Sequence, residues 1–162
     1  MFQADRFDVA VLELSRPVIM QAHIQPLCLA EEELRPGEEV RVAGWGATHP
    51  TLLTRPKVLQ TTEVITVDNK LCEQWHWYVV YLHPMMVYVF TFCVFRNAGI
   101  NVRIHREQVC AGHEAGGRDA CLGDSGGPLM ARDLVTGLWR LVGVVSAGFS
   151  CAQPGQPGIY HR

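Results

Sequence analysis

The sequence predicts an all-β protein built as an antiparallel β-barrel. Short apolar segments rich in β-branched residues recur along the chain, and Gly, Pro and Asp residues separate them. The 162 residues correspond to roughly one domain, with 48% hydrophobic and 19% charged residues. With a formal net charge of only -2, this composition excludes a disordered chain and a protein that binds nucleic acid through a basic surface.

The order of these segments predicts the strands. The first one ends before Pro17, because proline does not continue a strand ladder. One short helix is expected at residues 69–76, with Asp68 as its N-cap. The acidic stretch 31–39 reads as a solvated loop between strands. Strands are expected at residues 8–14, 40–44, 58–67, 108–112, 128–131 and 138–146.

Six cysteines indicate an oxidising compartment, because the chain has no Cys-x-x-Cys pair of the kind that binds metal. Taken alone, they allow 15 full pairings. The N-terminal residues carry acids and a base without an apolar core, so they do not form a signal peptide. A secreted type of domain without an export signal leads us to expect that part of the chain is missing.

A candidate nucleophile stands in residues 119–128, Asp-Ala-Cys-Leu-Gly-Asp-Ser-Gly-Gly-Pro. Ser125 lies among glycines, so it can occupy a tight turn whose backbone N–H groups converge on one point. Such convergence stabilises a tetrahedral oxyanion, and the N–H groups of Gly123 and Ser125 are the expected donors. The alternative is a flexible glycine-rich loop.

A family resemblance favours the interpretation of Ser125 as a nucleophile over that of a flexible loop. Residues 123–128 resemble the nucleophile motif of trypsin-like, chymotrypsin-fold serine proteases, and further family signatures follow in the family's order at residues 7–12, 44–46, 145–148 and 157–160.

Finer details are most similar to arthropod trypsin-like proteases of the clip-domain or membrane-anchored kind. These details are found at residues 72–76, 96–100 and 155–162. The resemblance implies the second barrel of the two-barrel fold, truncated at both ends. Residues 1–30 would be a remnant of the first barrel and the inter-barrel segment, and residues 31–162 the second barrel.

The resemblance implies a serine endopeptidase that acts on protein substrates. Ser125 would be the nucleophile, and Asp8 would orient the catalytic histidine. Asp119 would lie at the base of the primary pocket, where a carboxylate selects Arg or Lys at the cleavage site. The alternative for Asp119 is a surface turn residue. The other substrate-binding positions would be Ser146, Gly148 and Gly158.

The catalytic histidine is absent from the expected place. In the family it precedes the aspartate, whereas the seven histidines of this chain all follow Asp8. Because loss of the general base costs several orders of magnitude in rate, we predict that the chain as written is inactive. The alternative function is a non-catalytic protease homologue that acts as a cofactor or adaptor in an extracellular protease cascade.

The resemblance also implies the cysteine pairing. Cys72 would bond to Cys110 and Cys121 to Cys151, while Cys28 would form a disulfide with a propeptide or light chain. Cys93 has no counterpart in the family.

Activation and location follow from the same resemblance. Asp124 would pair with the N-terminal ammonium that activation of a zymogen releases. The resemblance implies neither a cofactor nor a metal, and it implies a secreted or extracellular protein.

A hydrophobic window interrupts the chain. Residues 74–95 contain no Asp, Glu, Lys or Arg, and residues 77–95 interrupt the family pattern. A membrane-spanning helix needs about 20 apolar residues, but a central His83-Pro84 and flanking cysteines expected to bridge argue against one. We interpret 77–95 as an insertion and hypothesise that it is retained intron sequence; the alternative is a hydrophobic surface loop near the pocket.

Overall fold

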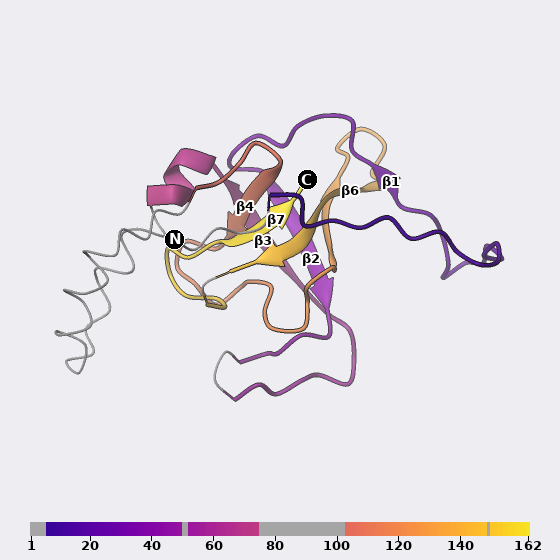
Figure 1. Ribbon diagram of the computed structural model, residues 1–162, viewed down its shortest axis with the longest axis horizontal. Helices are drawn as coiled ribbons and strands as arrows, with labels where there is room; N and C mark the ends of the chain where they lie inside the picture. The colour runs from indigo at the N-terminus through magenta and orange to yellow at the C-terminus, as the bar shows by residue number, and fades with distance from the viewer. Residues whose placement is uncertain (1–5, 50–51, 75–102, 149) are drawn as a thin grey trace.

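The described part of the chain forms a closed β-barrel. The computed structural model describes residues 6–49, 52–74, 103–148 and 150–162 (Figure 1). Six antiparallel strands close in the order β6, β5, β2, β3, β4, β7 and back to β6. The seven strands are β1 (Cys28–Leu29), β2 (Glu39–Gly44), β3 (Gln60–Val67), β4 (Gln108–Gly112), β5 (Pro128–Arg132), β6 (Trp139–Ala147) and β7 (Gly158–His161).

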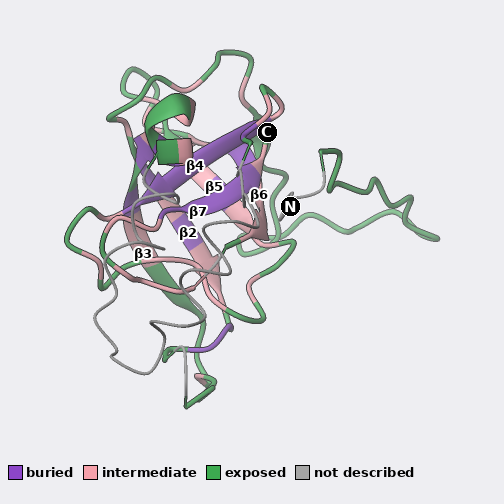
Figure 2. Cartoon of the chain, turned by 60° about the vertical axis from the view of Figure 1, so that its left-hand side comes forward, coloured by how far each residue is buried: buried purple, intermediate pink, exposed green. Residues whose placement is uncertain are grey.

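The core fills the inside of this barrel. On β2, Val40 and Val42 are buried while the residue between them is partly exposed, which is the alternation expected of a strand with one face inward. Strand β4 is buried along its whole length (Figure 2). The buried cluster consists of Val40, Val42, Val64, Val109, Ala111, Leu129, Val142 and Tyr160.

Residues 9–27 form an extended arm, called here the N-terminal arm. It runs out from the barrel and returns to β1, with one turn closed by the bridge between Gln21 and Ile24 (Figure 1). The strand predicted at 8–14 is wrong as a regular element, because the described residues offer it no partner strand. Its apolar side chains are accordingly exposed, 97% for Val11 and 84% for Leu12.

The other predicted strands are confirmed with small shifts at their ends. Strand β3 begins at Gln60 rather than at residue 58. Strand β1 was not predicted, and it pairs parallel to β6 over only two residues. The acidic stretch does lie between strands, since β1 ends at Leu29 and β2 begins at Glu39.

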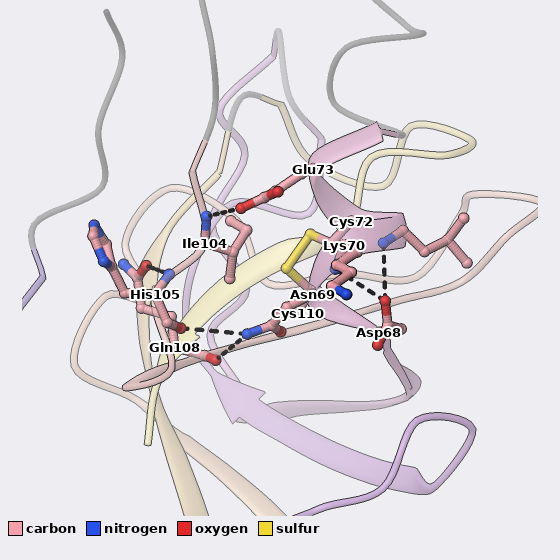
Figure 3. Close-up of a disulfide and its surroundings, with 10 residues drawn as sticks. Asp68, Asn69, Lys70, Cys72, Glu73, Ile104, His105, Gln108 and Cys110 are labelled. Atoms are coloured by element: carbon pink, nitrogen blue, oxygen red, sulfur yellow. Dashed lines mark hydrogen bonds between the residues drawn. A yellow bond between two sulfur atoms is a disulfide. The ribbon is translucent and has the colours of Figure 1, made fainter.

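The predicted helix begins where the sequence places it. Residues 69–74 are helical, and the Asp68 carboxylate accepts bonds from the N–H groups of Lys70 and Leu71 at 3.0 and 3.1 Å (Figure 3). These bonds satisfy N–H groups that have no partner within the helix. The Cys72–Cys110 disulfide ties this helix to β4.

Residues that precede and follow the hydrophobic window in the sequence lie in contact in the structure. The backbone N–H of Ile104 donates to the Glu73 carboxylate at 2.8 Å (Figure 3). The predicted insertion 77–95 itself lies outside the described residues. Because Glu73 and Ile104 already lie in contact, a shorter segment can join them, and residues can be removed between them without moving either one.

We therefore expect a variant that lacks residues 77–95 to keep its barrel and both disulfides. A connection that is 19 residues shorter costs less entropy to close, so we expect no loss of stability. Thermal unfolding followed by circular dichroism, with peptide mapping of the disulfides, measures this. A chain with the order of 77–95 scrambled is the control. Loss of the cooperative transition in the deletion variant alone would show that the window belongs to the fold.

Candidate active site

The turn around Ser125 presents two backbone donors without acceptors. The N–H groups of Asp124, Gly126 and Gly127 all donate to backbone carbonyls at 2.8 to 2.9 Å. Among the described residues, the N–H groups of Gly123 and Ser125 donate to none. Gly123 adopts a φ of +100°, which glycine reaches without steric cost. The turn therefore holds two unused donors beside an exposed serine.

A hydrogen bond joins Asp8 to β6. The Ser146 hydroxyl donates to Asp8 Oδ2 at 2.6 Å. The pairing of β6 with β7 shifts register between Val145 and Ala147, so Ser146 has no partner residue on β7. Such irregularities re-aim side chains at active sites. Asp8 thus lies beside Ser146, which lines a cavity together with Ser125.

That cavity has a volume of about 350 Å³. Its walls include Ser146, Gly148 and Gly158, and Asp119 also lines it. The structure thus brings every expected substrate-binding residue to one cavity that opens beside Ser125.

The Asp119 carboxylate is held by backbone donors alone. Its Oδ1 accepts the N–H of Ala120 at 2.8 Å, and its Oδ2 accepts the N–H of Ala152 at 3.0 Å. No cation within the described ranges pairs with it. Burial raises the pKa of Asp119 to about 7, and the nearby charge of Asp124 adds to the rise. The Asp119 charge therefore has no counter-ion among the described residues, and ionising it costs free energy.

Close packing explains the glycine at 158. A β-carbon there would lie 2.9 Å from Asp119 Oδ1 and 3.3 Å from the Tyr160 hydroxyl. Tyr160 is fully buried, and its hydroxyl has no hydrogen-bond partner in the described structure. Burial and the Asp119 charge raise the pKa of Tyr160. The buried Tyr160 ring and the Asp119 carboxylate therefore leave room only for a glycine at position 158.

Asp124 follows the turn residue Gly123 and does not line this cavity. Its Oδ1 accepts the N–H of Gly46 at 2.7 Å, and its Oδ2 accepts that of Cys121 at 2.9 Å. It lines a second cavity of about 280 Å³. Asp119 and the Cys121–Cys151 disulfide line both cavities, so they form a shared wall.

The two disulfides are the pairs that the family resemblance implied. Cys72 bonds to Cys110, and Cys121 bonds to Cys151 beside the cavity of Asp119. Cys28 carries a free, exposed thiol. Cys93 lies outside the described residues.

Two contributors to the site were missed by sequence reasoning. Ala152 adopts a φ of +56°, and this turn aims its N–H at Asp119. No residue type signals such a turn at an alanine. Tyr160 stands in the segment that carried the family resemblance, but only the structure shows that its hydroxyl is buried and unpaired.

The fold and this arrangement agree with the comparison to known families. The sequence model of the Trypsin family matches residues 1–162. The chain therefore belongs to the trypsin family of serine proteases.

Three curated relatives illustrate the similarity. Human testisin is 36% identical over 157 residues, which cover 95% of this chain and 43% of testisin. The clotting factor G beta subunit of Tachypleus tridentatus is 35% identical, over 96% of this chain and 46% of that protein. Transmembrane protease serine 9 of Rattus norvegicus is 34% identical over 96% of this chain and 12% of its own length. The chain thus spans less than half the length of these relatives.

No helix among the described residues is long and apolar enough to cross a membrane. The window 77–95, considered above as a membrane segment, is not among them.

Proposed function

We propose that this chain carries the nucleophile, the orienting carboxylate and the primary pocket of a secreted or extracellular serine endopeptidase that cleaves after Arg or Lys. The observation that supports the specificity is the buried Asp119 carboxylate, which has two backbone donors and no cation partner in the described structure. A guanidinium or ammonium group entering the cavity beside Ser125 supplies the missing charge.

Each residue has a role in this proposal. Ser125 attacks the carbonyl carbon of the peptide bond, and the N–H groups of Gly123 and Ser125 stabilise the oxyanion. Asp8 accepts a bond from Ser146 through Oδ2, which leaves Oδ1 to orient a histidine. That histidine is not among the residues before Asp8 in this sequence, so the chain as written lacks its general base.

Activation of a zymogen would act on Asp124. Backbone N–H groups hold its carboxylate, and none of the ion pairs in the described ranges includes it. The second cavity offers room for an incoming N-terminal ammonium against this charge. Cys28, exposed and free, would hold a propeptide or light chain by a disulfide.

A second candidate is a non-catalytic homologue that serves as a cofactor or adaptor in an extracellular protease cascade. The residue that occupies the position of the catalytic histidine in the longer protein would decide between the two. Retention of Ser125 and Asp119 favours the endopeptidase.

The test compares binding with turnover in one preparation of the 162-residue chain. We expect benzamidine, which carries an arginine-like amidinium, to bind at least tenfold more tightly than neutral benzamide, because only the cation pairs with Asp119. We expect no hydrolysis of an arginine peptide ester above that of a Ser125→Ala variant.

Equal binding of the two ligands would overturn the proposed specificity. Hydrolysis that Ser125→Ala abolishes would show that another group replaces the histidine. Absence of hydrolysis from a longer gene product with a histidine before Asp8 would favour the adaptor.

A further inference from the structure

An arginine lies next to the expected oxyanion hole. The loop between β2 and β3 carries Arg55 back to the turn of Gly123. The guanidinium carbon and one terminal nitrogen of Arg55 each lie 3.7 Å from the place a β-carbon on Gly123 would occupy. A positive charge therefore lies directly beside the turn that carries Ser125.

The loop that carries Arg55 is held in place. The N–H of Ala47 donates to the carbonyl of Leu122 at 2.8 Å, which fastens the start of the loop to the nucleophile turn. Thr48 and Thr54 then bond to each other through the backbone at 2.9 Å and through their hydroxyls at 3.0 Å. The residue before Arg55 is thereby fixed.

The charge of Arg55 is available to a ligand. Its side chain is exposed, and none of the ion pairs among the described residues includes it. Arg55 is not among the residues that line the cavity of Asp119. It therefore lies beside the turn but outside the primary pocket.

The geometry of an extended substrate indicates which of its residues would face Arg55. Successive side chains of an extended chain point to opposite faces, so the second residue after the cleaved bond faces the same surface as the side chain in the pocket. We propose that, with that side chain in the cavity of Asp119 and its carbonyl at Gly123, the leaving segment passes the Arg55 side of the turn, and that Arg55 selects substrates with a carboxylate at the second residue after the cleaved bond. This inference rests on the proposed function.

The test uses equilibrium binding to the 162-residue chain, because the chain is expected not to cleave the probe. The probes are fluorescent peptides of the sequence Gly-Arg-Ala-Glu-Ala and Gly-Arg-Ala-Gln-Ala, both amidated, and anisotropy reports their affinities. We expect the glutamate peptide to bind about threefold more tightly at low salt, as an exposed ion pair provides. The preference should vanish near 1 M salt.

Variants separate this inference from the proposed function. Arg55→Gln should remove the preference and leave the glutamine peptide unaffected, whereas Lys57→Gln, a matched loss of charge on the same loop, should keep the preference. Asp119→Asn should lower the affinity of both peptides by the same factor. Equal affinities for the two peptides, both sensitive to Asp119→Asn, would overturn the inference alone. If Asp119→Asn leaves the affinity of both peptides unchanged, both the proposed function and this inference are overturned.

Discussion

Benzamidine is expected to bind the cavity about 100-fold more weakly at pH 5 than at pH 8. The amidinium keeps its charge over this range, but Asp119, with its pKa raised to about 7 by burial, loses its charge as the pH falls. Each pH unit below 7 thus lowers the affinity about tenfold. Fluorescence titration across this range measures the profile.

The control for this profile is Asp119→Asn. It should bind benzamidine weakly at every pH, because no carboxylate remains to be ionised. A profile in the parent chain with its midpoint near pH 4 would contradict the effect of burial. If Asp119→Asn shows the same pH dependence of benzamidine affinity, another group is responsible for the titration.

The same carboxyl group makes stability depend on pH. The folded chain binds its proton more tightly than the unfolded chain, where the pKa is near 3.8. Stability is therefore highest below about pH 4 for this group and falls as the pH rises to about 7, by up to about 4 kcal/mol. Urea unfolding at pH 5 and pH 8 should show about 3 kcal/mol of this loss in the parent chain and none of it in Asp119→Asn.

Replacing Gly44 by alanine is expected to destabilise the chain by about 3 kcal/mol. A β-carbon at Gly44 would lie 1.9 Å from Asp124 Oδ1, so the carboxylate must move and its bonds to the N–H groups of Gly46 and Cys121 are lost. For a chain of this length we expect the midpoint of thermal unfolding to fall by about 10 °C.

A double variant and a matched glycine test the cause. Gly44→Ala combined with Asp124→Ala should lose less stability than the two single losses added, because the smaller side chain leaves room. Gly148→Ala should have little effect, since its nearest contact would be an ordinary 3.5 Å. Additive losses in the double variant would contradict the proposed clash.

The strands that sequence predicts well have partners on both sides. Strand β4 (Gln108–Gly112) has the predicted limits, since its apolar residues are buried against β3 and β7. The same kind of pattern at residues 8–14 gives no strand, because a ladder depends on a neighbour that no local pattern reports. The helix start at Asp68 was predictable, because an N-cap is a local interaction.

The site was predictable in its residue types and not in its contacts. The motif and the family resemblance named Ser125, Asp119 and Asp124 from local sequence. The space that Gly44 leaves for Asp124 and the N–H that Ala152 aims at Asp119 depend on segments far apart in the chain. Arg55 carried no signal, because its nearness to Gly123 arises only from the path of its loop.

The N-terminal arm connects two residues, Asp8 and Cys28, that each contact β6 through hydrogen bonds. At one end Asp8 bonds to Ser146, and at the other Cys28 pairs with Arg140. The arm keeps the Asp8 carboxylate at an effective concentration in the millimolar range beside Ser146. Once the arm is cut, the bond from Ser146 to Asp8 and the ion pair of Arg6 with Glu107 at 2.9 Å are the described contacts left to hold residues 6–8. A hydrogen bond worth about 1 kcal/mol and one surface ion pair do not hold a free peptide at that level. One cut anywhere in the exposed arm therefore releases Asp8 and leaves every strand of the barrel intact.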